Sequence, residues 1–239
     1  MNTIPVLHSN TRFIAHRGLS SLETENTAAA FVAAGNRSYY GIETDVHKTA
    51  DGHFVVIHDD NTRRVSGISN EVEQTKLSKL RSLTLKDLDG RPRADLKIPT
   101  LQEYIHICKR YQKVCVLELK THFASKEVKR IISIAQKERY LDHVLFISFD
   151  FENLTALREL LPGQPAQLLT SDDPSEKMVQ LIKQYRFGLN CRYTQLSKKI
   201  VSEMHQQGIE VNCWTCDDAK TAQTLISWGV DYITTNILE

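Results

Sequence analysis

Short apolar segments alternate with longer amphipathic segments along most of the chain. Runs of the first kind are typical of buried strands, and segments of the second kind are typical of helices that cover a sheet. Their alternation predicts βα units and a parallel sheet. The expected strands are Arg12–Ala15, Tyr40–Val46, Val114–Lys120, Val144–Phe149, Ala166–Thr170, Phe187–Cys191, Ile209–Trp214 and Asp231–Thr235.

Helical patterns follow most of these strands, at Asn26–Ala34, Ser125–Arg139, Phe151–Leu161, Pro174–Tyr185, Ser197–Gln207 and Asp218–Trp228. Eight strands separated mainly by helices are the number that closes a TIM-type barrel. The predicted fold class is therefore α/β, a TIM (β/α)8 barrel. An open doubly wound sheet gives similar alternation and stays the alternative.

The alternation is interrupted once, over Asp59–Pro99, where polar residues and turn formers flank one helical stretch, Lys76–Leu88. This segment is too small for an independent domain, so it is interpreted as an insertion after the second strand that shapes access to a site. Residues 1–239 are expected to form one barrel domain, because α/β barrels of this length are commonly single domains.

Charge and composition exclude several classes of partner. Thirty basic residues against twenty-nine acidic residues give a net charge of +1, so no overall field favours nucleic acid or an anionic membrane. No apolar run approaches the ~20 residues that span a bilayer, and the first residues lack the pattern of a signal peptide. We expect a cytoplasmic protein without membrane insertion, whose five cysteines are reduced.

Acidic residues share one face of the second predicted strand. Glu43 and Asp45 lie two residues apart, so their side chains point the same way. The Asp51-Gly52 pair that follows is typical of a two-residue hairpin turn, and such a turn places His58 opposite Asp45 on that same face. A longer turn shifts this register.

The same alternation places Glu118 and Lys120 on one face of the third strand. If that face lines the barrel, Glu118 is a third inward carboxylate. Three buried carboxylates repel one another and lose hydration unless a cation compensates, and oxygen ligands favour Mg²⁺, Ca²⁺ or Mn²⁺. The sequence therefore predicts a divalent metal site.

The first strand ends on His16-Arg17-Gly18, at the rim where such barrels place their chemistry. We expect Arg17 and Lys120 to bind phosphate oxygens, unless they pair with core carboxylates. Gly18 is expected to let a ligand approach closely. Two histidines beside carboxylates and a metal suit metal-assisted phosphoryl chemistry, in which the imidazoles move protons.

These residues resemble the glycerophosphodiester phosphodiesterase family, in its bacterial, cytoplasmic type. The resemblance covers nearly the whole chain. It is carried by Ala15-His16-Arg17-Gly18, Glu25-Asn26-Thr27, Gly41-Ile42-Glu43-Thr44-Asp45-Val46, Asp51-Gly52, Val55-Val56-Ile57-His58-Asp59, Ile98-Pro99-Thr100-Leu101, Glu118-Leu119-Lys120, Trp214-Thr215, Gly229-Val230-Asp231 and Thr235-Asn236.

The resemblance implies a TIM barrel, a divalent metal on Glu43, Asp45 and Glu118, and His16 with His58 as the acid–base pair. The implied partner is a small glycerophosphodiester, hydrolysed to sn-glycerol 3-phosphate and an alcohol. Trp214 would line the substrate pocket, and its alternative role is that of a core aromatic at the barrel rim. Because no serine or cysteine nucleophile lies in the proposed cluster, we expect the glycerol 2-hydroxyl to attack and form a cyclic phosphate. Homo-oligomerisation stays open.

Three other functions are weighed against this one. Cys213 and Cys216 have the spacing of a dithiol redox motif. A catalytically silent barrel would bind phosphodiesters without a second proton-transfer group. A zinc hydrolase would use His16, His58 and Asp45 as ligands, and tightly held zinc would distinguish it.

Overall fold

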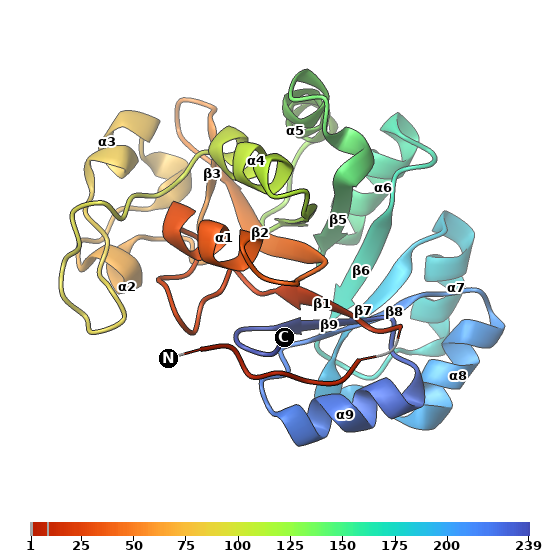
Figure 1. Ribbon diagram of the computed structural model, residues 1–239. Helices are drawn as coiled ribbons and strands as arrows, with labels where there is room; N and C mark the ends of the chain where they lie inside the picture. Colours follow the sequence, from red (N-terminus) through yellow and green to blue (C-terminus); the bar gives the residue numbers. More distant parts are fainter. Residues whose placement is uncertain (1, 9) are drawn as a thin grey trace.

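Eight parallel strands close into a barrel in the computed structural model, which describes residues 2–8 and 10–239 (Figure 1). The hydrogen-bonded order is β1-β9-β8-β7-β6-β5-β4-β2, and β1 also pairs with β2, which closes the ring. The prediction of a TIM barrel is confirmed, and the open-sheet alternative is wrong because a first strand bonded on both sides leaves no edge there.

The barrel strands match the predicted ones closely. The bounds of β1 and β6 are as predicted, and the other strands differ only at their ends. The strands are β1 (Arg12–Ala15), β2 (Gly41–Lys48), β4 (Val114–Leu119), β5 (Val144–Ser148), β6 (Ala166–Thr170), β7 (Gly188–Arg192), β8 (Val211–Trp214) and β9 (Tyr232–Thr235).

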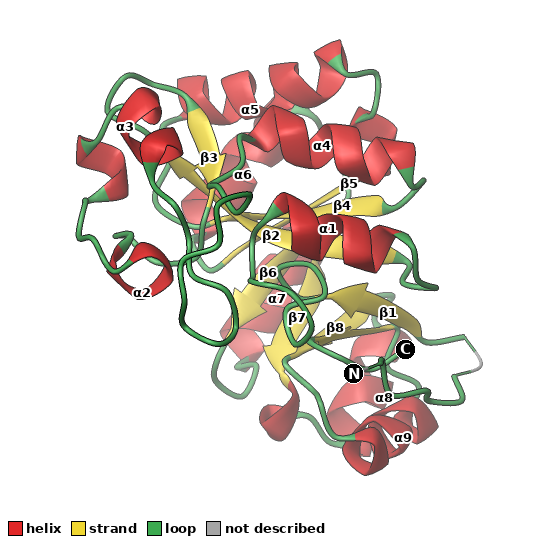
Figure 2. Cartoon of the chain, turned by 60° about the vertical axis from the view of Figure 1, so that its left-hand side comes forward, coloured by secondary structure: helices red, strands yellow, loops and turns green. Residues whose placement is uncertain are grey.

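Helices cover the outside of the barrel (Figure 2). One of them, α4, follows the insertion and was not predicted, although Thr100 and Glu103 form a capping box at its start. The helices are α1 (Ala28–Gly35), α2 (Arg63–Ser66), α3 (Leu77–Ser82), α4 (Leu101–Arg110), α5 (Ser125–Lys137), α6 (Phe151–Leu160), α7 (Glu176–Tyr185), α8 (Lys198–Gln206) and α9 (Ala219–Trp228), with short 3₁₀ turns at Val72–Gln74, Leu141–His143 and Tyr193–Gln195.

The barrel has two apolar layers. The larger one lies between strands and helices and includes Ile42 and Leu117. A smaller cluster, which includes Ile14, Val116 and Leu169, fills the interior of the barrel. Because side chains alternate along each strand, residues next to Ile42 on β2 point inward, and this places Glu43 above the interior cluster.

The insertion has its own small core. Strand β3 (Phe54–Val56), which precedes the insertion, pairs antiparallel with β2, and buried side chains of the insertion including Leu80 and Leu85 pack with Val55 of this strand. The predicted helix Lys76–Leu88 is wrong in its second half, because helix α3 ends at Ser82. The backbone N–H of Leu85 instead donates to the carbonyl of Leu96, and its carbonyl accepts the N–H of Arg93, so this tertiary pairing overrides the helical pattern. In Figure 1 the insertion around α2 and α3 projects from the side of the barrel.

Within the described part of the chain, we find no helix whose length and apolar content would let it traverse a lipid bilayer.

Candidate active site

A cavity of about 230 Å³ opens where the barrel strands end at their carboxyl sides. It brings together residues that are far apart in the sequence, as the predicted site requires. The residues that line it include all but one of the predicted site residues: His16, Arg17, Glu43, His58, Glu118, Lys120 and Trp214, with Ile147, Phe149, Leu169, Asn190, Thr215 and Thr234. The exception is Asp45, which is buried.

Glu43, Asp45 and Glu118 form a buried acidic cluster. Each offers a carboxylate oxygen, and these oxygens lie within 4.8 Å of one another. Strand register explains the convergence, because Asp45 on β2 is the direct neighbour of Glu118 on β4. The predicted inward face of both strands is thus confirmed, and the donor set fits a hard divalent cation.

Two cations contact the acidic cluster without neutralising it. Lys120 Nζ lies 3.0 Å from Glu118 Oε1 and 3.3 Å from Asp45 Oδ1, and Arg17 Nε lies 3.5 Å from Asp45 Oδ2. Three carboxylates therefore face two cationic side chains. Among the residues that the structure describes, the Glu43 side chain accepts one hydrogen bond, from the backbone N–H of Arg17 at 2.8 Å, and none from a cationic side chain.

The pKa values of the three acids diverge because of this arrangement. Burial, reinforced by Asp45, raises the pKa of Glu118 to about 7, and burial together with Asp45 and Glu118 raises that of Glu43. Burial also pushes the pKa of Asp45 upward, but Lys120 and Arg17 outweigh it and lower that pKa to about 2. The cluster thus holds more negative charge than its own cations stabilise, which is the condition that a metal ion would relieve.

Asn26 fixes the orientation of Asp45. Its side-chain Nδ2 donates to Asp45 Oδ2 at 2.8 Å, and its Oδ1 accepts the hydroxyl of Thr44. The backbone of Asn26 is left-handed, with φ of 52°, which asparagine tolerates better than most residues. Only its place in the Glu25-Asn26-Thr27 motif could have indicated this role.

His16 is held by a chain of polar side chains. Its Nδ1 lies 2.8 Å from Asn236 Oδ1, and Asn236 Nδ2 donates to Asp217 Oδ2 at 2.6 Å. A carboxylate only accepts, so Asp217 fixes which way the Asn236 amide points. Nδ1 of His16 therefore carries a hydrogen, and Nε2 is the nitrogen left for the cavity. Burial and the neighbouring Arg17 lower the pKa of His16 to about 4, so its imidazole is neutral at pH 7.

His58 lines the cavity, but the strand register that places it there differs from the predicted one. The turn after β2 has three residues, Ala50 to Gly52, and Thr49 pairs with His53. The backbone N–H of Ile57, not His58, therefore bonds to Asp45, so the predicted pairing of His58 with Asp45 is wrong. His58 lies beyond the end of β3, and its Nδ1 is 2.8 Å from Asp59 Oδ1.

One arginine of the insertion joins both sides of the site. Arg64 donates to both carboxylate oxygens of Asp59, at 2.7 and 2.9 Å, and to both of Glu25, at 2.9 and 2.8 Å. Asp59 in turn accepts from His58, and Glu25 accepts from Arg17 at 2.9 Å. Hydrogen bonds from Arg64 hold the pKa of Asp59 well below its usual range. Nothing in the spacing of these residues predicted this contact.

The remaining predicted residues lie at the rim. Arg17 and Lys120 pair with carboxylates, so the alternative role raised for them is confirmed, and because both also line the cavity their binding of phosphate oxygens stays a prediction. Gly18 packs closely against Ala30, because a Cβ built on it would lie 2.7 Å from the Ala30 backbone, and its expected contact with a ligand stays a prediction. Trp214 lines the cavity, with Phe149 edge-on at 5.6 Å and Arg192 over its ring at 5.7 Å.

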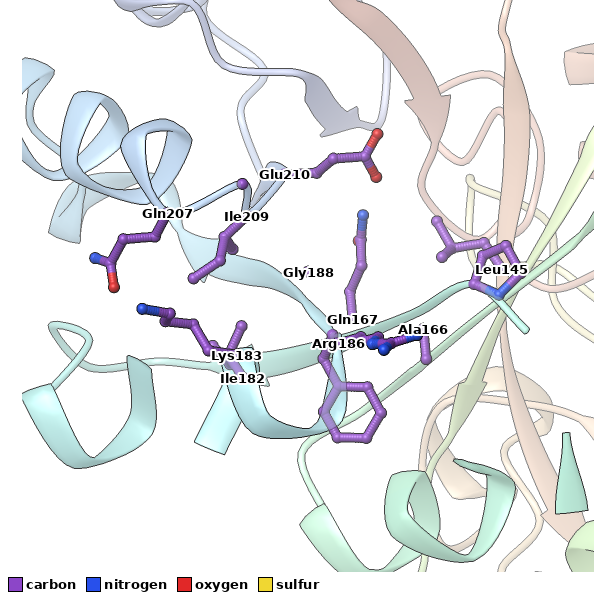
Figure 3. Close-up of a pocket in the computed structure, with 13 residues that line it drawn as sticks. Leu145, Ala166, Gln167, Ile182, Lys183, Arg186, Gly188, Gln207, Ile209 and Glu210 are labelled. Atoms are coloured by element: carbon purple, nitrogen blue, oxygen red, sulfur yellow. The ribbon is translucent and has the colours of Figure 1, made fainter. Parts of the chain in front are cut away.

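A second, larger cavity of about 380 Å³ lies at the opposite end of the barrel (Figure 3). Its lining residues include Ala166 and Gly188, which begin β6 and β7, and Glu210, which directly precedes β8, and others come from helix α7 and the adjoining loops. Neither the acidic cluster nor either of the two predicted catalytic histidines lines it. The predicted metal-binding and catalytic residues therefore lie at the carboxyl ends of the strands, not at this second cavity.

The redox alternative loses its support in this structure. Cys213 and Cys216 are both buried, and burial raises the pKa of the Cys213 thiol and raises that of Cys216 to about 11. A redox dithiol needs the opposite shift, toward thiolate.

The proposed zinc ligands do not gather into a metal site. Among residues 2–8 and 10–239, His16, His58 and Asp45 do not form a group of converging donor atoms. The one such group with a histidine is His122, Asp150 and Glu152, which lies outside the cavity.

Comparison with known proteins agrees with the fold and the site. The model of the glycerophosphoryl diester phosphodiesterase family matches residues 16–239. The Bacillus subtilis protein YhdW is 30% identical over 230 residues, which is 93% of each chain. The glycerophosphodiester phosphodiesterase of Caldanaerobacter subterraneus subsp. tengcongensis is 28% identical over 95% of this chain and 94% of its own.

Among solved structures, an Oleispira antarctica phosphodiesterase in complex with its product sn-glycerol 3-phosphate superposes with a TM-score of 0.85. The two sequences are 25% identical, and the alignment covers 94% of this chain and 92% of that one. The fold and site thus define a barrel hydrolase of phosphoric diesters. The chain belongs to the glycerophosphoryl diester phosphodiesterase family.

Proposed function

We propose that this enzyme hydrolyses glycerophosphodiesters to sn-glycerol 3-phosphate and an alcohol, with a divalent cation held by Glu43, Asp45 and Glu118. The observation that carries the proposal is the convergence of this buried acidic cluster with two histidines in one cavity, each with its Nδ1 already bonded. Mg²⁺, Ca²⁺ and Mn²⁺ suit three carboxylate ligands. A bound cation would neutralise charge on a phosphate oxygen and so favour attack at phosphorus.

His16 is assigned as the general base of the first step. Its imidazole is neutral at pH 7, and the bond from Nδ1 to Asn236 leaves the lone pair on Nε2. Nε2 takes the proton of the glycerol 2-hydroxyl while that oxygen bonds to phosphorus. Because a positioned internal hydroxyl acts at high effective concentration, this attack is favoured over attack by free water.

His58 is assigned as the general acid. It gives the Nε2 proton to the headgroup oxygen as the bond from phosphorus to that oxygen breaks. Asp59 holds the His58 ring through Nδ1, in the way that the aspartate of a Ser-His-Asp triad orients its histidine. Arg17 and Lys120 are placed to bind phosphate oxygens while the charge redistributes.

The second step opens the cyclic phosphate. His58, now neutral, takes a proton from water as the water oxygen bonds to phosphorus. His16 returns its proton to the 2-oxygen as the ring bond breaks. Both histidines thus regain their starting states, and sn-glycerol 3-phosphate leaves.

Alcohol release from a panel of glycerophosphodiesters tests the activity, and an analogue with hydrogen in place of the 2-hydroxyl tests the route. The analogue should bind through its phosphate yet release no alcohol. Turnover of the analogue at a rate comparable to the parent would eliminate the cyclic route and show direct attack by water.

A further inference from the structure

Asn190 presents a buried amide with no protein partner to the active-site cavity. The residue lies on β7 and is 1% exposed, and it is one of the residues that line the cavity. Among the described residues, its side-chain Oδ1 has no hydrogen-bond partner, and its side-chain nitrogen donates to none. The hydrogen bond made by Asn190 to a side chain uses its backbone oxygen, which accepts from Trp214 Nε1 at 3.3 Å.

The neighbouring amide of Asn212 has partners for both of its halves. Asn212, the neighbour of Asn190 on β8, donates to Gln167 and accepts from Thr234. An amide left without partners in a closed interior costs about 1–3 kcal/mol, so such a group is expected to meet a ligand or an ordered water. Its position in the cavity makes a ligand group the natural partner.

The surroundings of Asn190 define the ligand group that fits. On the neighbouring strand its partner is Leu169, and Ile147 and Trp214 complete an apolar wall. The acidic cluster lies on β2 and β4, across the barrel from β7. A phosphodiester bound at the cluster would place its short carbon chain along this wall, with the end of that chain toward an amide that can both donate and accept.

We propose that Asn190 binds the terminal hydroxyl of the glycerol moiety. The enzyme would thereby select glycerol diesters over diesters of diols that lack this hydroxyl, such as propane-1,2-diol. This inference rests on the proposed function. A hydroxyl is the group that uses both halves of an amide, as donor to Oδ1 and acceptor from Nδ2. A quaternary ammonium headgroup has neither a donor nor an acceptor for it, whereas the glycerol hydroxyl is common to every substrate of the class.

Two ligands that differ by that one hydroxyl test the proposal. The first is a glycerophosphodiester, and the second is the matched diester of propane-1,2-diol, which keeps the secondary hydroxyl and lacks the terminal one. A site built to bond a hydroxyl rejects the analogue that lacks it, and for one neutral pair we expect kcat/KM to be roughly tenfold to a hundredfold higher for the glycerol diester.

In Asn190→Leu, which keeps the branched shape and removes both polar atoms, this ratio should fall close to one. Cys191→Ala changes the next residue of β7 on the opposite, outward face, and should leave the ratio as in the unmodified enzyme. Asn190→Ala serves if the leucine variant does not fold. An unchanged ratio in the Asn190 variants, or an equal loss for both diesters, would overturn the proposal.

Calorimetry with the metal-loaded enzyme separates this proposal from the function on which it rests. sn-Glycerol 3-phosphate should bind at least tenfold more tightly than the phosphate of propane-1,2-diol. Equal binding would show that Asn190 faces only water, even with normal turnover. Selective binding without any turnover would sustain the hydroxyl subsite and refute the proposed reaction.

Discussion

Arg64 should control turnover although it touches neither the acidic cluster nor, by the proposed mechanism, the substrate. It belongs to helix α2 of the insertion, and its guanidinium bonds both Asp59 and Glu25. Asp59 orients His58, and Glu25 holds Arg17. Arg64→Met removes the charge and all four hydrogen bonds at once, and it leaves two neighbouring carboxylates to repel each other.

The magnitude follows from the exposure of this arginine. Hydrogen bonds to charged groups are worth about 1.5–3 kcal/mol each when sheltered from water, but exposed ion pairs contribute about 0.2–1 kcal/mol. The Arg64 side chain is 48% exposed and those of Asp59 and Glu25 are 27% and 20% exposed, so the lower range applies to stability. We expect unfolding to become easier by about 1 kcal/mol, with a larger effect on the orientation of His58, so that kcat falls roughly tenfold to a hundredfold.

The assay is steady-state release of sn-glycerol 3-phosphate at saturating metal. kcat should fall more than KM changes, because His58 acts on the leaving group rather than on binding, and Arg17 keeps its ion pair with Asp45 after Glu25 is released. The kcat of Arg64→Lys should lie between those of the unmodified enzyme and Arg64→Met, since one ammonium cannot bond two carboxylates in a bidentate manner. Arg63→Met is the matched control, because Arg63 is an exposed neighbour on the same helix. If Arg64→Met matched this control, or lost metal binding in place of turnover, the positioning role would be refuted.

Three further outcomes are expected. Asp45→Asn should fold and lose more metal affinity than the roughly 10–100-fold that an outer-shell partner costs, and unchanged affinity by calorimetry would place the metal elsewhere. His16→Ala and His58→Ala should each lower turnover by roughly 10²–10⁴-fold, and a His58→Ala enzyme that folds but binds no metal would make His58 a ligand. The folded pKa of Glu118, about 7, lies above the usual 4.5, so without metal its contribution to stability is present below pH 4.5 and is lost as the pH rises through 7. A bound cation reverses this loss, and Mg²⁺ should raise the melting temperature more at about pH 8 than at about pH 5; an equal rise would contradict the assignment of Glu118 as a ligand.

The sequence was a good guide wherever side-chain alternation alone decides position. The period of two along β2 and β4 placed Glu43, Asp45 and Glu118 on one inward face, and the parallel register of the two strands then brought Asp45 beside Glu118. Side-chain alternation does not determine how two strands joined by a turn are paired. Asp51-Gly52 indicated a hairpin correctly, but the length of the turn was wrong by one residue, and that error moved His58 out of the predicted pairing.

Contacts between distant segments were beyond the reach of the pattern. Arg64 bonds Asp59 and Glu25 because α2 folds back over the first loop, and Asn236 holds His16 because β9 closes the barrel against β1. Asn190 carried no signal at all, since an asparagine at a strand centre is usually satisfied by a neighbour. Such residues are recognised only when the three-dimensional structure shows which hydrogen-bond partners they have or lack.

The most direct test of the proposed reaction is the release of sn-glycerol 3-phosphate by enzyme stripped of metal, before and after stepwise addition of Mg²⁺, Ca²⁺ or Mn²⁺. We expect no release from the stripped enzyme, restoration as the cation saturates a single site, and no restoration in Glu43→Gln, whose fold should persist. Full activity in a demonstrably metal-free preparation, or normal restoration in Glu43→Gln, would contradict the assignment of the acidic cluster as the catalytic metal site.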